Sequence, residues 1–298
     1  MLNNKKLFLQ DLSKIIGAIA AKESLLAAMG FKTSRIGVSS NTYPYVIKLF
    51  KRYKIQYVIG NYRYTYINDI GKGGWSNRFG DETHIERSNA KGDYFLYIAN
   101  SKVKAKAARE KEENEEEFEF GETLGIPSCC AKFYVDYSEK AFKKQNDFVL
   151  FVLEKTISKP PYDFWNNYVS QYFGYSLLSF FPCSFDCPES VKISKQVFNL
   201  LDNVYPDFAK KFLYFHKQNI LYTEYRGIYL FENSSLRKDS IVYKNSRIHS
   251  TIKNSSIGKT IFQCDNIMVK GKNHCTFYIG DKLVRNLIGE NIALCLFN

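Results

Sequence analysis

The sequence LGIPSCCAKF occupies residues 124–133, and FPCSFDCPES occupies residues 181–190. The two segments contain four of the chain's seven cysteines: Cys129, Cys130, Cys183 and Cys187. Proline is favoured in the first turn of a helix, so we expect helices to begin near Pro127 and Pro188. The pattern therefore predicts that the N-termini of two helices bring the four thiols together.

Four converging thiolates are a ligand set for zinc or for an iron–sulfur cluster. Cys183 and Cys187 have three residues between them, a spacing typical of structural zinc. Cys129 and Cys130 fit zinc poorly, because neighbouring side chains tend to diverge in strands and helices alike. We therefore predict a metal centre, with a 4Fe-4S cluster ahead of zinc. Reactive thiols without a metal and buried structural cysteines are the alternatives.

Three carboxylates near these cysteines are candidates for acid–base catalysis. Glu122 lies seven residues before Cys129, and Asp186 and Glu189 flank Cys187. An exposed position at a helix end is the favoured explanation of Glu122, and capping of a helix start explains Asp186 and Glu189 equally well.

Two further groups of residues have a structural and a functional interpretation. His274 and Cys275, with Cys264, suggest a second metal site, although cysteines in β hairpins usually pack in the core.

A run rich in tyrosine resembles a stacking platform for single-stranded nucleic acid. The alternation of a half-buried strand accounts for this run equally well, and it comprises Lys54, Tyr57, Tyr62, Arg63, Tyr64 and Tyr66.

The chain of 298 residues has a formal net charge of +12. Such a charge attracts anions, so we expect an anionic small molecule, RNA or DNA as partner. Lys72, Arg78 and Arg87, near the glycine-rich residues 71–74, are the candidate anion-binding side chains. A lysine-rich surface that serves solubility alone is the alternative.

The location of the chain is predicted from its N-terminus and its cysteines. No signal sequence precedes residue 30, and no apolar run approaches the roughly 18 residues of a membrane-spanning helix. We therefore expect a cytoplasmic protein without a membrane anchor. An odd number of cysteines also argues against a complete disulfide framework, and reduced thiols fit the cytoplasm.

The order of helical and β-prone segments predicts an α+β fold in three units. Residues 1–104 form a small α/β unit, residues 105–220 a helical centre with the cysteine site, and residues 221–298 a β-rich unit. Within residues 105–118 the sequence predicts a charged, solvated helix or a linker. The helices expected next span residues 139–157, 163–178 and 188–216. Residues 260–264 are expected to form one of the short C-terminal strands.

The cysteine segments resemble an uncharacterised family, a domain of unknown function common in archaea. Its members pair a Gly-Tyr-Pro-x-Cys-Cys motif with a later Pro-Cys-x-x-x-Cys-x-x-Ser motif. The likeness covers residues 117–195, with Ile126 where tyrosine is usual, and implies a shared cysteine site. The cysteine pattern is also loosely similar to that of the non-cobalamin epoxyqueuosine reductases, by analogy of ligands alone.

Together these features favour a metalloenzyme that transforms an anionic substrate such as a nucleotide, a tRNA base or an acidic metabolite. A nucleic-acid-binding module with a structural four-cysteine zinc site is the alternative from another class.

Overall fold

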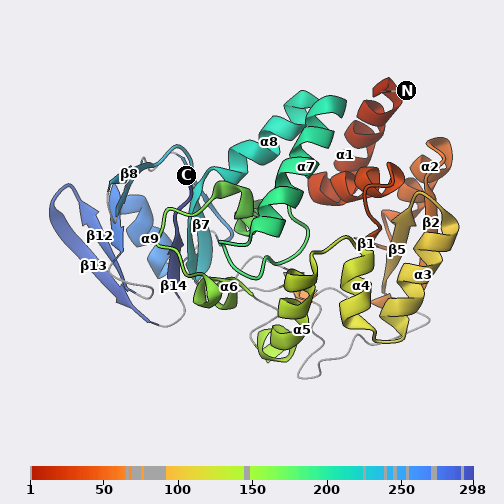
Figure 1. The fold of residues 1–298 in the computed structure, drawn as a ribbon. Helices are drawn as coiled ribbons and strands as arrows, with labels where there is room; N and C mark the ends of the chain where they lie inside the picture. Colours follow the sequence, from red (N-terminus) through yellow and green to blue (C-terminus); the bar gives the residue numbers. More distant parts are fainter. Residues whose placement is uncertain are drawn as a thin grey trace.

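The computed structural model has an α+β fold, as the sequence predicts, with helices and antiparallel sheets. Its three parts follow one another across the molecule, from the N-terminal part through the helical centre to the C-terminal sheets (Figure 1). The structure describes residues 2–64, 67–68, 75–76, 92–143, 148–223, 226–237, 240–243, 247–252, 255–269, 274–289 and 292–298.

The N-terminal part is a three-stranded antiparallel sheet of order β1-β5-β2, covered by helices. Its elements in chain order are α1 (Leu2–Ala28), β1 (Ser34–Val38), α2 (Tyr43–Arg52), β2 (Gln56–Tyr64), β3 (Ile67–Asn68), β4 (Trp75–Ser76) and β5 (Asp93–Ala99). Strands β1 and β2 lie on either side of β5. Ile36 of β1 is opposite Leu96, and Tyr57 of β2 is opposite Ile98. Leu96 and Ile98 are fully buried and form the centre of this core.

Helix α1 is broken at Gly17, whose φ of 82° and ψ of 167° are not helical. Glycine adopts such a conformation readily because it has no Cβ. A second helical segment, residues 18–28, therefore starts in a new direction and packs against β1 and β5. Phe31 N–H donates to the Leu26 carbonyl past the end of this segment, and Gly30 has a positive φ of 79°, as a helix C-terminus favours.

The charged segment after β5 is helical with a largely solvated face, as the sequence predicts, and its other face packs against the sheet. It forms α3 (Lys102–Glu113) and α4 (Glu117–Thr123). Ala105 and Ala108 of α3 are fully buried in a cluster with side chains of β2 and β5. On the sheet, Arg35 forms an ion pair with Glu112, and Tyr97 donates a 2.7 Å hydrogen bond to the same carboxylate. The charges of this segment thus hold it to the N-terminal sheet.

The helical centre differs from the sequence expectation in where its helices break. It comprises α5 (Ser128–Lys143), α6 (Val149–Lys155), the 3-10 turns η1 (Phe164–Asn166) and η2 (Tyr168–Phe173), α7 (Pro188–Val204) and α8 (Pro206–His216). The prediction of a helix over residues 163–178 was wrong. Here Asn166 and Asn167 donate side-chain hydrogen bonds to distant backbone carbonyls, and Gly174 ends the turns with a φ of 83°. The helix expected over 188–216 is two helices, divided at Tyr205.

The C-terminal part consists of two antiparallel sheets that share one core. One sheet has the order β10-β7-β6-β14 and the other the order β13-β12-β11-β9-β8. The first contains β6 (Asn219–Thr223), β7 (Gly227–Phe231), β10 (Ile248–Ser250) and β14 (Ile292–Cys295). The second contains β8 (Ser235–Arg237), β9 (Ser240–Val242), β11 (Asn266–Val269), β12 (His274–Ile279) and β13 (Lys282–Ile288).

One segment of this part is a helix where the sequence predicts a strand. Residues 260–264 belong mostly to α9 (Ser256–Gln263), whose N-cap Ser255 accepts a hydrogen bond from Gly258 N–H. Ile257 and Ile261, one turn apart, are fully buried in the core between the two sheets. The cap and the four-residue apolar spacing thus override the β propensity of the segment.

The hydrophobic clusters cross the boundaries at residues 104 and 220, so the division into three units stays a prediction. Val197 and Phe212 of α7 and α8 share a cluster with α1 and the N-terminal sheet. Phe148 and Phe185 of the centre share another with Ile220 and Phe297. Within the part of the chain that the structure describes, no helix has the length and apolar character needed to span a membrane.

Candidate metal centre

The four cysteines of the two motifs meet at one point of the structure. Their sulfur atoms all lie within 4.8 Å of one another. Cys129 Sγ is 3.8 Å from Cys130 Sγ and 3.7 Å from Cys187 Sγ, and Cys130 Sγ is 3.6 Å from Cys187 Sγ. Cys183 N–H also donates to Cys130 Sγ over 3.4 Å. Sequence positions more than fifty residues apart thus form one sulfur cluster that could bind a metal ion.

Two helix N-termini surround the sulfurs, as the prolines predict. Cys129 and Cys130 lie in the first turn of α5, whose first hydrogen bonds run from Cys130 N–H and Ala131 N–H to the Pro127 carbonyl. Cys187 is the N-cap of α7, directly before Pro188. The positive ends of both helix dipoles therefore face the sulfurs, where they stabilise negative charge.

The adjacent pair converges, contrary to the expectation that neighbouring side chains diverge. Consecutive residues of a helix leave its axis about 100° apart. Rotation about the Cα–Cβ bonds of Cys129 and Cys130 is enough to bring their sulfurs to 3.8 Å. The spacing that argued against a single metal ion at the sequence level is therefore no obstacle in this structure.

Buried polar side chains hold the loop that carries Cys183 and Cys187. The Asn166 amide donates to the carbonyls of Phe185 (2.8 Å) and Cys187 (3.1 Å). Ser190 Oγ donates to Asn166 Oδ1 over 2.7 Å, and Phe185 N–H donates to Thr156 Oγ1 over 2.9 Å. Asn166 and Ser190 are fully buried. These contacts set the position of the two sulfurs from outside the cluster.

Sequence reasoning missed Asn166, because the helix expected over residues 163–178 would have made it an ordinary helical residue. No local pattern marks it. Its signal is tertiary, since the carbonyls that it binds lie 19 and 21 residues further along the chain.

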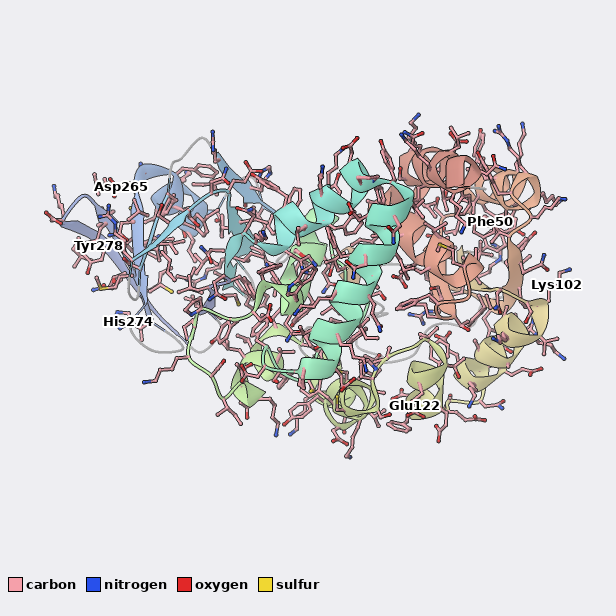
Figure 2. The ribbon with its side chains drawn as sticks, turned by 45° about the horizontal axis from the view of Figure 1, so that its top comes forward. Phe50, Lys102, Glu122, Asp265, His274 and Tyr278 are labelled. Atoms are coloured by element: carbon pink, nitrogen blue, oxygen red, sulfur yellow. The ribbon has the colours of Figure 1, made fainter. Side chains whose placement is uncertain are left out.

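The three candidate catalytic carboxylates lie outside the group of converging metal-ligand atoms. Asp186 accepts hydrogen bonds from Ile157 N–H and Ser158 N–H, at 2.8 and 2.9 Å. Glu189 is exposed, with its carboxylate 4.0 Å from Lys192 Nζ. Glu122 lies at the surface (Figure 2), where its carboxylate accepts a 2.6 Å hydrogen bond from Ser128 Oγ at the start of α5. The catalytic role of the three stays a prediction.

The pKa shifts of the cysteines show how charge is distributed over the cluster. Hydrogen bonds from the thiols of Cys130 and Cys183, with a contribution from Ser190, hold the pKa of Cys187 far below its usual range. Hydrogen bonds with Cys183 and Cys187, followed by burial, raise the pKa of Cys130. The hydrogen bonds of the cluster thus favour the thiolate form at Cys187 over Cys130, and a cation that binds would displace protons from the thiols.

Among the remaining sequence candidates, those within the described residues do not join this site. Lys72, Arg78 and Arg87 lie outside the described residues. His274 is at the far end of the molecule (Figure 2), and among the described residues the group of metal-ligand atoms consists of the four cysteines, without His274, Cys264 or Cys275. Tyr64 of the suggested stacking platform is 3% exposed and stacks on Phe95 in the core, which favours the half-buried strand as its explanation.

Fold and site together define an α+β protein with a four-cysteine group that could bind a metal ion. Comparison with family models, with curated proteins and with solved structures finds none that matches this chain. The likeness to the family with paired cysteine motifs therefore stays a prediction.

Proposed function

We propose that the four cysteines bind one zinc ion in a closed tetrahedral site. The observation that supports this is the spacing of the sulfurs. With Zn–S bonds of about 2.3 Å, the edges of a tetrahedral four-thiolate site are about 3.8 Å long. Three of the sulfur pairs are 3.6, 3.7 and 3.8 Å apart.

The same spacing favours zinc over the 4Fe-4S cluster that we ranked first from the sequence. In a multi-iron cluster each thiolate binds a different iron atom, so the metal core keeps the sulfurs farther apart than a shared ion does. Closed four-cysteine zinc sites are structural. The ion would fasten α5 to the loop before α7, and its binding free energy would add to the stability of the fold.

Metal analysis of protein purified without oxygen tests this proposal. We expect one zinc per chain, no absorbance near 400 nm, and a tetrahedral thiolate spectrum after exchange for Co²⁺. Cys130→Ser and Cys187→Ser should lower zinc content sharply. Cys264→Ala, which removes a buried thiol of the C-terminal part, should retain it. Several irons per chain with absorbance near 400 nm would contradict the zinc site, and a metal-free protein would contradict any metal site.

A second candidate function is a metalloenzyme that acts on an anionic substrate, and the exposure of one cysteine favours it. Cys129 is exposed, whereas Cys130 and Cys187 are buried. Three inner thiolates would then hold the metal or an iron–sulfur cluster, and the position of Cys129 would be open to substrate. In this case Cys129→Ser should retain the metal, whereas in the closed zinc site it should lose affinity as Cys130→Ser and Cys187→Ser do.

The positive charge of the chain supports a proposal about its partners and location. With a net charge of +12, we expect binding to RNA or DNA whose affinity falls steeply with salt concentration. Titration of a labelled oligonucleotide at several salt concentrations measures this slope, and a salt-independent or absent signal would contradict it. Seven free cysteines fit a reducing compartment, so we propose the cytoplasm as its location.

A further inference from the structure

A pocket of about 690 Å³ lies between the N-terminal part and the helical centre. One wall is the break in α1 at Gly17 to Ala20, and a second is strand β1. Further lining comes from residues of the segments 124–126 and 171–181 and from Lys32, Thr42 and Asp93. Its volume is within the roughly 300–1,000 Å³ range of pockets that bind small molecules.

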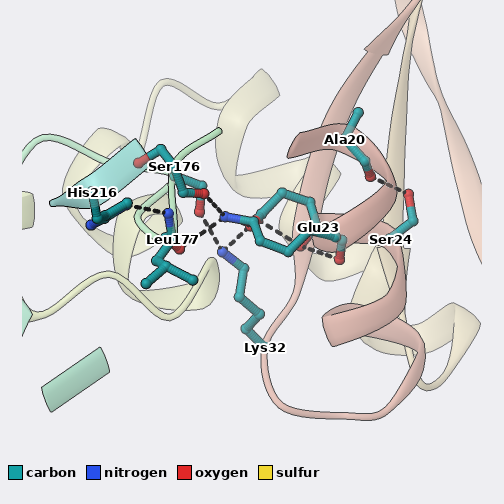
Figure 3. Close-up of polar contacts among 10 residues, drawn as sticks. Ala20, Glu23, Ser24, Lys32, Ser176, Leu177 and His216 are labelled. Atoms are coloured by element: carbon teal, nitrogen blue, oxygen red, sulfur yellow. Dashed lines mark hydrogen bonds and ion pairs between the residues drawn. The ribbon is translucent and has the colours of Figure 1, made fainter. Parts of the chain in front are cut away.

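Two buried ammonium groups share one carboxylate at this pocket (Figure 3). Glu23 accepts from Lys32 Nζ over 2.6 Å and lies 3.1 Å from Lys22 Nζ. Lys22 is fully buried and donates to the carbonyls of Ser176 (2.7 Å) and Leu177 (2.8 Å). The Lys32 side chain, 9% exposed, lines the pocket with Glu23 and also donates to Ser179 Oγ over 2.8 Å.

This cluster carries one positive charge more than its carboxylate neutralises. A buried net charge is costly unless a counter-charge reaches it. The two other charged side chains of the lining have partners elsewhere: Arg35 pairs with Glu112, and Asp93 accepts from Ser40 N–H over 2.8 Å. The excess charge is therefore located at Lys22 and Lys32, and Lys32 is the one that lines the pocket.

The surroundings of Lys32 add to the attraction for an anion and define the rest of the ligand. The helical segment that starts after Gly17 directs the positive end of its dipole toward the pocket wall. The lining is otherwise rich in aliphatic and aromatic side chains, among them Ile19, Ile36 and Phe181. A ligand that satisfies both features has one anionic group and an apolar body.

We propose that this pocket binds a small organic anion whose carboxylate or phosphate contacts Lys32 and whose apolar body packs against Ile19, Ile36 and Phe181. This proposal concerns a site separate from the cysteines and does not depend on which metal they hold. It rests on none of the candidate anion-binding side chains Lys72, Arg78 and Arg87, which lie outside the described residues.

Binding of two simple anions and one uncharged analogue tests the proposal. The probes are 3-phenylpropionate, phenyl phosphate and 3-phenylpropan-1-ol, measured by saturation-transfer NMR and by calorimetry on the full chain. We expect at least one acid to bind at least tenfold more tightly than the alcohol. The stronger of the two acids identifies the head group as carboxylate or phosphate. Equal binding of acids and alcohol, or no binding of either acid, would overturn the proposal.

Two variants locate the site, and a third serves as the control. Lys32→Gln removes the charge and should weaken binding of the acid at least tenfold. Ala18→Phe fills the pocket wall without changing charge and should abolish binding even if Lys32→Gln fails to fold. Lys48→Gln removes an exposed lysine of α2 outside the lining and should leave affinity unchanged. Undiminished binding in Ala18→Phe, or in a folded Lys32→Gln, would overturn the proposal. Zinc content measured in the same samples reports on the cysteine site separately.

Discussion

At the scale of single residues, the buried Asn166 side chain binds the cysteine loop at two of its carbonyls. Its amide satisfies the carbonyls of Phe185 and Cys187, and its oxygen accepts from Ser190. The side chain has no exposed surface, so water cannot replace it. Groups that position the ligands of a metal in this way influence its affinity without touching it.

Asn166→Ala should therefore weaken both the fold and metal binding. The change removes the buried hydrogen bonds to the Phe185 and Cys187 carbonyls and the acceptor of Ser190 Oγ, for which we expect a loss of about 3 kcal/mol in the free energy of unfolding. Zinc affinity should fall roughly 10- to 100-fold. Urea unfolding and competition with a chelator measure the two effects. Asn199→Ala, on the exposed face of α7, should change neither. A wild-type zinc affinity in Asn166→Ala would contradict this role.

Glu23 makes the free energy of unfolding depend on pH. Burial acts to raise the pKa of Glu23, but the charges of Lys32 and Lys22 outweigh it and lower the pKa to about 2, from 4.5. A carboxyl whose pKa is lowered on folding stabilises the protein above the pKa of the unfolded chain. That contribution is lost as the pH falls from about 4.5 toward 2.

Glu23→Gln should accordingly lower the free energy of unfolding at pH 7 by about 3–5 kcal/mol, because two buried ammonium groups lose their partner. The difference from the wild type should shrink as the pH falls below about 4.5. Urea titrations between pH 7 and pH 3 measure it. Glu189→Gln, whose side chain is exposed, is the matched control. A difference that stays constant over this range would contradict the assigned pKa.

At the scale of elements, the contact between α4 and α5 positions the first turn that carries Cys129 and Cys130. A Cβ added to Gly121 of α4 would lie 3.1 Å from the Cβ of Ala131 in α5. Both residues are buried, so the two helices approach closely because Gly121 has no side chain. Ala131 directly follows Cys130, and any separation of the helices therefore reaches the sulfur cluster.

Gly121→Val should push the helices apart and cost about 1–3 kcal/mol in the free energy of unfolding through overpacking. The added change Ala131→Gly should recover part of the loss, as a double-mutant cycle would show. Glu119→Val places the same side chain on the exposed face of α4 and is the control. If the effects of the two substitutions on the free energy of unfolding are additive, the contact between residues 121 and 131 does not cause the loss.

Elements also show where sequence reasoning succeeds and where it fails. The starts of α5 and α7 follow from Pro127 and Pro188, because proline restricts its own backbone locally. The region of residues 163–178 does not follow, because Asn166 and Asn167 bind carbonyls that only the tertiary fold brings near. The same holds for the packing of α3, whose charges bind Arg35 and Tyr97 of the sheet.

At the scale of the whole molecule, the C-terminus of the chain supports the cysteine loop. Phe297 is 5% exposed, and its ring centroid lies 5.4 Å from that of Phe185 and 6.2 Å from that of Tyr162. Phe185 lies between Cys183 and Cys187 in the sequence. The last residues of the chain thus complete the core on which the second cysteine motif rests.

Phe297→Ala should reduce the free energy of unfolding by about 3–5 kcal/mol through loss of buried surface and a residual cavity. It should also weaken zinc binding, because Phe185 loses its support. Phe262→Ala removes an aromatic ring that is 42% exposed and should have little effect on either quantity. Thermal unfolding measured with and without zinc gives the stability of each variant and its zinc binding. A destabilised variant with unchanged zinc affinity would show that Phe297 does not influence metal binding.

The sequence by itself determined the α+β class, the four candidate ligands and the two helix starts beside them, because proline and cysteine spacing act over a few residues. Only the tertiary structure decided that the sulfurs of Cys129, Cys130, Cys183 and Cys187 lie within 4.8 Å of one another. It also decided that Lys22 and Lys32 share Glu23 at a pocket. The sulfur contacts join residues up to 58 positions apart, and Lys22 also donates to the Leu177 carbonyl, 155 positions away. They depend on how the helices and sheets pack, which short-range patterns do not encode.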